Sequence, residues 1–370
     1  METVIQKSTR TLAQVGEALG IRNLDRESGK IFIVDGSGVI GYRVAKKLCK
    51  AGYPCVRLGG CSSVSLPWSD LDGVEIISDF NWNDTSTYEK ALKGIKSVLV
   101  TIPYTEKWYE TFFAFIEACH HAHVKHIVKL SFYHARNHDD VFHEIPLVRH
   151  HGICDQQLIQ TVNPAPPLKA FLSNEIVAPG MDVCVRPNMS YTILFATHYM
   201  SDPFTFQGAE LRSNNKPSTM YGATRNHGVN YVSPNDVAEV AVRVLLAPSE
   251  HYDKMYTLTG PKAITEQQVA SQISKYLRKP IMYVDQPLNK FGMNLKSPRF
   301  VVDDMVAFER VKATGTEEDH AFVSDDIETI CGHPPETYEE YLRAVEMMTD
   351  IEAGPPPRDD LVPLKEVVSN

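Results

Sequence analysis

Closely spaced glycines follow a short apolar run near residue 31 and have the spacing of a turn that holds phosphate groups. The run Ile31–Val34 leads into the hexapeptide Gly36-Ser37-Gly38-Val39-Ile40-Gly41, which opens a segment with helical spacing of apolar residues. Gly36 permits a tight turn, Gly38 lets backbone N–H groups approach a pyrophosphate, and Gly41 lets the helix pack closely on the strand. The helix N-terminus adds partial positive charge. The sequence therefore predicts a dinucleotide-binding turn. The alternative is a strand-to-helix turn without a ligand.

The end of the second predicted strand is the place where the adenosine ribose would bind, about 20 residues beyond such a turn. The segment there reads Arg57-Leu58-Gly59-Gly60 and contains no Asp or Glu to accept hydrogen bonds from a ribose 2′-hydroxyl. An arginine is able to pair with a 2′-phosphate instead. The sequence therefore favours NADP over NAD, with loss of cofactor binding as an alternative.

Short apolar runs alternate with longer segments of helical periodicity from Lys30 onward. Strands are predicted at Lys30–Val34, Cys55–Leu58, Val74–Ile77, Ser97–Thr101, His126–Leu130 and Asp182–Arg186, and helices near 39–51, 85–94, 105–121 and 147–160. This alternation is typical of parallel βαβ units. It predicts an α/β fold with a doubly wound parallel sheet of the Rossmann type, whose ligands bind at the carboxyl ends of the strands.

Four regions are predicted along the chain. They are a leader helix in residues 1–28, the Rossmann domain in 29–190 with an insertion at 161–181, a smaller and mostly helical C-terminal lobe in 191–350, and a flexible tail in 351–370. Helices of the lobe are marked by capping sequences that begin at Ser233, Thr265 and Thr337. We expect this lobe to complete the site at the carboxyl edge of the sheet.

Composition argues against several classes of function. The 370 residues carry a formal net charge of −9, and no block of basic residues is present that would neutralise a nucleic-acid backbone. No apolar run reaches the roughly 20 residues that a membrane-spanning helix needs. The seven cysteines include no Cys-x-x-Cys pair, which argues against a disulfide framework and a thiolate zinc site. We therefore expect a cytoplasmic protein that neither spans a membrane nor binds nucleic acid directly.

Histidines gather at 120–126 and at 134–150. The first group ends a predicted helix, where partial negative charge favours cations. The second lies in a polar segment after the fifth predicted strand, and a lid over the site is one interpretation of it. Both groups are explained without a metal ion, so no metal site is expected.

Several separated segments, spread over about residues 30–345, resemble the NmrA-like branch of the atypical short-chain dehydrogenase/reductase superfamily. The turn at 36–41 resembles the glycine turn of that family, and Glu75–Asp79 its third strand. Val124–Ser131 is similar to the fifth strand, and Cys184–Asn188 to the sixth strand and the Arg-Pro loop beside the nicotinamide. Residues 230–238, 256–261 and 330–340 resemble segments of the C-terminal half of the family.

Together with the turn and Arg57, the resemblance implies a cofactor site with contributions from several elements. Its residues are Gly36, Ser37, Gly38, Val39, Ile40, Gly41, Arg57, Asp79, Phe80, Thr101, Ile102, Pro103, Ser131, His151 and Pro187. The resemblance implies that Asp79 lies on the adenine side and Ser131 on the active-site side.

Reductases of this superfamily commonly carry a Lys, or a Tyr with a Lys four residues later, on the helix after the fifth strand. These groups supply the proton that accompanies hydride transfer. In this chain the resemblance places His151 at the Lys position and Leu147 at the Tyr position, so the usual donor is missing. The catalytic candidates are then His151, Tyr133 and Ser131. The alternative is that His150 and His151 are partly exposed helix residues without a role.

Three hypotheses follow. The leading one is an NAD(P)-binding, NmrA-like protein with weak or no turnover, which acts as a cofactor-dependent regulator or redox sensor through a conformational change or a protein partner. The second is an active NAD(P)H-dependent oxidoreductase that reduces a small carbonyl, enone or quinone. In the third, the protein has lost the cofactor and is a scaffold that contacts its partners through the leader helix and the 161–181 insertion.

Overall fold

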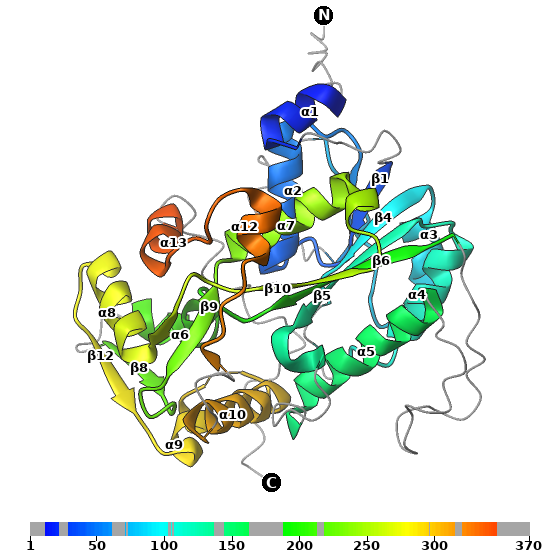
Figure 1. Cartoon of the computed structure of the whole chain (residues 1–370). Coiled ribbons are helices and arrows are strands. Elements are labelled where there is room, and N and C mark those ends of the chain that lie inside the picture. Colours follow the sequence, from blue (N-terminus) through cyan, green and yellow to red (C-terminus); the bar gives the residue numbers. More distant parts are fainter. Residues whose placement is uncertain are drawn as a thin grey trace, which may run out of the picture.

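The computed structural model describes residues 12–21, 29–60, 71, 73–102, 105, 107–136, 144–162, 188–212, 218–295, 297–314 and 320–345 (Figure 1). Most of the predicted insertion, most of the predicted leader and the whole predicted tail lie outside these residues. No helix of the described residues is long and apolar enough to cross a membrane.

The centre of the molecule is a parallel sheet of seven strands in the order β10-β6-β5-β4-β1-β2-β3. The strands are β1 Lys30–Ile33, β2 Val56–Leu58, β3 Glu75–Ile76, β4 Ile95–Val100, β5 His126–Phe132, β6 Ser190–Ala196 and β10 Lys254–Leu258. The chain moves outward from β1 in both directions, so the doubly wound sheet is confirmed. Helices cover both faces, so the inner strands are largely buried and rich in apolar residues.

Two helical layers enclose this sheet (Figure 1). One contains α2 Val39–Ala51, α7 Pro234–Leu246 and α12 Asp326–Cys331; the other contains α3 Tyr88–Leu92, α4 Phe112–His121 and α5 Pro146–Val162. In α7 the predicted apolar face (Val237, Val240, Ala241, Val244 and Leu245) is fully buried. The Ser233 hydroxyl caps this helix by accepting a hydrogen bond from the N–H of Asn235.

The sixth strand of the sheet is not where the sequence predicted it. The predicted strand Asp182–Arg186 lies outside the described residues, and the strand that pairs with β5 is Ser190–Ala196, with Ser131 opposite Phe195. Two apolar runs follow each other here, and periodicity alone does not rank them. The central sheet continues past the predicted domain boundary at residue 190, because β6 and β10 extend it to Leu258.

The C-terminal lobe combines helices with two small sheets, so it is less purely helical than predicted. Its helices are α6 Asp202–Arg212, α8 Glu266–Leu277, α9 Leu288–Asn294, α10 Arg299–Thr314 and α13 Tyr338–Val345. One sheet contains β7 His198–Tyr199, β9 Gly228–Val232 and β11 Ala263–Thr265, and the other contains β8 Ser218–Gly222 and β12 Ile281–Asp285. The predicted capping box of α8 is confirmed, with Thr265 and Gln268 bonded reciprocally.

Shorter elements complete the fold. Helix α1, Leu12–Leu19, lies within the predicted leader and packs on α2, with Val15 buried. Single 3₁₀ turns occur at η2 Thr85–Thr87, η3 Tyr133–Arg136 and η6 Pro248–Glu250. Of these, η3 directly follows β5 and therefore lies at the carboxyl edge of the sheet.

Candidate dinucleotide site

The glycine turn joins β1 to α2 at the carboxyl edge of the sheet. Gly38 caps α2, and a Cβ built on Gly41 would lie 1.9 Å from the carbonyl oxygen of Asp35, so only glycine fits there. This contact gives Gly41 the close-packing role that was predicted for it. The first N–H groups of a helix have no intrahelical acceptor, so the N-terminus of α2 is a potential anion site.

Asp35 adds a carboxylate to this turn, which the sequence analysis did not single out. Its Oδ2 lies 2.5 Å from the position that a Cβ of Gly38 would take. The single O–H of Ser37 is shared between two acceptors, the carbonyl oxygen of Gly60 at 2.9 Å and Asp35 Oδ1 at 3.3 Å. A negative charge of the protein therefore lies at the N-terminus of α2, where it competes with a bound phosphate.

Arg57 has a different role from the predicted one. Its Nη1 donates to the carbonyls of Lys90, Ala91 and Lys93 at 3.4, 2.7 and 2.9 Å, and its Nη2 pairs with Glu75 at 3.0 Å. The arginine is buried, and its hydrogen bonds connect β2 to the end of α3 and to β3. This geometry does not support a contact between Arg57 and a 2′-phosphate.

Asp79 and Phe80 follow β3 and differ in exposure. Asp79 is exposed and forms an ion pair with Lys90 at 2.7 Å. Phe80 is buried against Phe32 in an edge-to-face contact, and a Cβ on Gly59 would lie 2.6 Å from the Phe80 ring. Phe80 is thus packed in the core beneath the end of β2, and Asp79 faces solvent on the predicted adenine side.

Thr101 and Ile102 directly follow β4, beside the glycine turn in the sheet order. The Thr101 hydroxyl is buried, and its Oγ1 has no hydrogen-bond partner among the described residues. A buried unpaired hydroxyl costs free energy, and a ligand is one way to satisfy it. Together with the cradle around Gly38 and Gly41, this hydroxyl fits a dinucleotide lying across the edge. Pro103 and Pro187 lie outside the described residues.

A buried ion pair lies behind this edge, between β5 and α5. The Lys129 ammonium is 2.6 Å from Asp155 Oδ1, and the Ser131 hydroxyl donates to Asp155 Oδ2 at 2.5 Å. Lys129 is completely buried and Asp155 nearly so, and burial raises the pKa of Asp155 despite the nearby cation. Lys129 also lies over the Phe112 ring at 5.5 Å. The Ser131 hydroxyl therefore already has an acceptor within the protein, the Asp155 carboxylate.

His151 contacts the same cluster. Its Nδ1 is 3.3 Å from Lys129 Nζ, and its ring packs against Trp108 at 4.6 Å between centroids. Dense packing holds the pKa of His151 well below its usual range, and the Lys129 and His150 charges lower it further. His151 is therefore neutral near pH 7, and donation from Lys129 to Nδ1 leaves the ring proton on Nε2.

The ring of the neighbouring His150 stacks on the Tyr109 ring, with 3.6 Å between the ring centroids. Tyr133 begins η3, and its ring stacks on Phe322 of the C-terminal lobe at 5.6 Å. The structure thus joins Ser131, His151, Lys129 and Asp155 in one cluster, whereas Tyr133 packs on the other lobe. A lysine within the apolar strand His126–Phe132 was the sequence signal for this cluster, because buried charges need partners.

Comparisons with known proteins support the fold. No family model matches the chain. The chain is 22% identical over 325 residues to "Prestalk A differentiation protein A" of Dictyostelium discoideum, which covers 87% of this chain and 94% of that protein. Among solved structures it resembles an NADPH-dependent quinone oxidoreductase of Escherichia coli complexed with NADPH. The TM-score is 0.63 at 19% identity, over 85% of this chain and 99% of that one.

It also resembles NmrA, a negative transcriptional regulator solved in complex with NAD. Here the TM-score is 0.60 at 15% identity, over 88% of this chain and 97% of that one. At these identities the likeness shows the fold. The predicted Rossmann-type fold is thus confirmed, and NmrA and the quinone oxidoreductase share it.

Proposed function

Because the chain has the Rossmann-type fold of NmrA and of a quinone oxidoreductase, we propose that it binds a nicotinamide dinucleotide across the carboxyl ends of β1, β4 and β5. We further propose that it acts as a cofactor-dependent regulator or redox sensor with weak or no turnover. The glycine cradle of Gly38 and Gly41 and the unsatisfied hydroxyl of Thr101 support the binding site. When bound, the cofactor supplies or accepts a hydride.

The regulatory proposal depends on the protonation states of His151 and Lys129, which lie where the proton donor is expected. His151 is neutral, and a neutral imidazole is a poor acid. The Lys129 ammonium is held by a buried carboxylate at 2.6 Å, so losing its proton would leave that carboxylate uncompensated. Among the described residues, this cluster therefore offers no readily available acid, while the turn for the cofactor is retained.

A second candidate function is reduction of a small carbonyl, enone or quinone, and one contact favours it. Lys129 Nζ lies 3.3 Å from His151 Nδ1, so His151 can pass a proton from its Nε2 to a substrate while it takes one from Lys129 at Nδ1. In this mechanism Asp155 holds Lys129 in position. The oxidoreductase fold of the quinone-reducing neighbour is consistent with such a role.

Calorimetric titration with NADPH, NADP, NADH and NAD tests the shared premise. Micromolar binding of one redox pair supports the site and decides between NADP and NAD, a preference that Arg57 no longer explains. If none of the four binds, both proposals fail and the scaffold hypothesis is favoured.

Turnover of NADPH or NADH with a panel of carbonyls, enones and quinones then separates the two functions. The regulator predicts negligible turnover and unchanged cofactor affinity in His151→Ala. The reductase predicts turnover that collapses in His151→Ala and persists in His121→Ala, a variant of an exposed histidine.

We also propose that the protein is cytoplasmic. The five cysteines in the described residues are free thiols, which is typical of a reducing compartment. Fractionation of cells that produce the full chain tests this location.

A further inference from the structure

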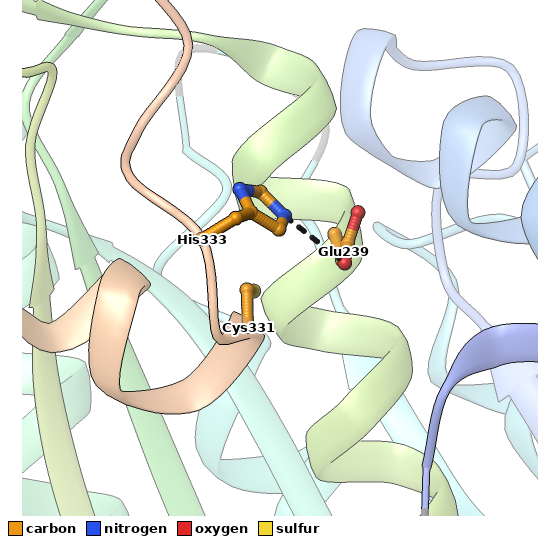
Figure 2. Close-up of side chains that lie close together, drawn as sticks. All are labelled: Glu239, Cys331 and His333. Atoms are coloured by element: carbon orange, nitrogen blue, oxygen red, sulfur yellow. Dashed lines mark hydrogen bonds and ion pairs between the residues drawn. The ribbon is translucent and has the colours of Figure 1, made fainter.

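Three side chains from separate elements meet beside α7 (Figure 2). Glu239 projects from α7, Cys331 ends α12, and His333 lies in the segment that leads to α13. One potential ligand atom from each lies within 4.8 Å of the others, and His333 Nε2 is 3.3 Å from Glu239 Oε1. We propose that Glu239, Cys331 and His333 form a binding site for a divalent transition-metal ion, with zinc as the favoured occupant.

The donor set determines the class of metal. A thiolate, an imidazole and a carboxylate are the three ligand types that zinc takes in proteins, whereas magnesium and calcium prefer oxygen ligands alone. Three protein ligands also leave one position of a tetrahedron for water. The His333 side chain is 45% exposed, so water reaches the site.

Small movements are sufficient to close the site on an ion. In a tetrahedral zinc site with bonds of about 2.0–2.3 Å, neighbouring ligand atoms are about 3.3–3.8 Å apart. The pair His333–Glu239 already meets this spacing at 3.3 Å. Cys331 and His333 flank Gly332, the C-cap of α12, which has a φ of +76°. Rotation of the two side chains about this turn would bring their ligand atoms onto an ion.

The surrounding charges hold the carboxylate in place. Glu239 Oε2 accepts from Lys47 at 3.1 Å, and Oε1 accepts from Arg243 at 3.0 Å. An ion would replace the proton of Cys331 and compete with these cations for Glu239. The Lys47 side chain is 34% exposed and can turn into solvent. Asp236, one turn earlier on α7, contributes a further negative charge near Cys331 and His333.

The position of the site indicates its effect on the fold. It would link α7, in the layer that covers the sheet, to the chain segment that continues into α13 of the C-terminal lobe. Glu239 also lines a groove of about 220 Å³ between α1, α2 and α7. A bound ion would fix α7 relative to the end of α12 and the segment that follows it, and it would stabilise the folded state by mass action.

Spectroscopic titration of the chelator-treated full-length protein with Co²⁺ tests this proposal. A thiolate ligand gives an intense near-ultraviolet sulfur-to-cobalt absorption. We expect this band in the wild type and its loss in Cys331→Ser. Cys55→Ser, at a half-buried cysteine elsewhere, should retain the band. His333→Gln and Glu239→Gln should weaken Zn²⁺ binding, measured by competition, at least about tenfold.

Thermal unfolding keeps the test valid if one variant folds poorly. Zn²⁺ should raise the melting temperature of the wild type and of Cys55→Ser, but not that of His333→Gln. An unchanged cobalt spectrum in Cys331→Ser, loss of the band in Cys55→Ser, or no Zn²⁺ binding by the wild type would each overturn the proposal. These measurements need no dinucleotide, so their outcome is independent of the proposed function.

Discussion

The ammonium group of Lys129 and the carboxylate of Asp155 form a buried ion pair at 2.6 Å between strand β5 of the central sheet and helix α5. Asp155 accepts a second hydrogen bond from Ser131, and Lys129 makes a second contact with His151. One strand and one helix therefore share a polar network in an otherwise apolar layer. A network of this kind is stable only while each member keeps its partner.

Asp155→Asn should therefore destabilise the protein strongly. Loss of the carboxylate leaves the Lys129 ammonium buried without a counter-charge, which costs about 3–5 kcal/mol. Denaturant unfolding measures this cost. The double variant Lys129→Met, Asp155→Leu should recover most of it, because both charges are removed together. Asp79→Asn, which breaks an exposed ion pair, should change stability by less than about 1 kcal/mol. An Asp155→Asn variant as stable as Asp79→Asn would contradict this account.

Much of the fold is predictable from local sequence, since the apolar runs and caps act through near neighbours. The turn at 36–41, the buried face of α7 and the capping box at Thr265 are of this kind. The pairing of Lys129 with Asp155 is not, because it depends on which helix packs on which strand. The same holds for Glu239 and His333, which are 94 residues apart.

The errors have physical reasons as well. Arg57 was assigned to a phosphate because its position along the chain fits, but its side chain points toward the carbonyls at the end of α3. The sixth strand was placed one apolar run too early, and only the pairing of β6 with β5 decides between the two runs.

Asp35→Asn should strengthen dinucleotide binding. The Asp35 carboxylate lies at the N-terminus of α2, where the site proposed above places a pyrophosphate, and like charges repel. Asn retains an acceptor for the Ser37 hydroxyl, so the turn is preserved. We expect the dissociation constant to fall about 3–10-fold at low salt, which corresponds to about 0.7–1.4 kcal/mol. Calorimetry measures this change, with Asp303→Asn, at an exposed ion pair of α10, as a charge-matched control. Weaker binding in Asp35→Asn would show that the carboxylate supports the site.

Gly41→Ala should abolish dinucleotide binding by deforming the turn. The added Cβ would lie 1.9 Å from the Asp35 carbonyl oxygen, so backbone must move. Overpacking of this kind costs about 1–3 kcal/mol of stability. Gly228→Ala is the control, since its Cβ would make an ordinary contact of 3.4 Å with Ala263. Melting temperatures with and without cofactor measure both effects. A Gly41→Ala variant that binds like the Gly228→Ala control would exclude the turn as the phosphate site.

His126 should make the protein less stable as the pH falls from 7 to 5. The ring is fully buried between Ser190, at 2.8 Å, and Thr192, at 3.2 Å. Burial, with a smaller contribution from the His251 charge, lowers the pKa of His126 to about 3. The unfolded chain has its ordinary histidine pKa near ~6.5 and so binds the extra proton between about pH 6.5 and 3. Stability is therefore full above the unfolded pKa and is lost as the pH decreases.

The loss amounts to about 2 kcal/mol from this one histidine between pH 7 and 5. Urea unfolding at the two pH values measures it. His126→Gln lacks the titrating group, so its pH dependence should be shallower by that amount even though its stability at pH 7 is lower. His121→Gln, at an exposed position, should keep the wild-type dependence. Equal slopes in His126→Gln and the wild type would contradict the lowered pKa of His126, because the imidazole would then take up the same proton in the folded and the unfolded state.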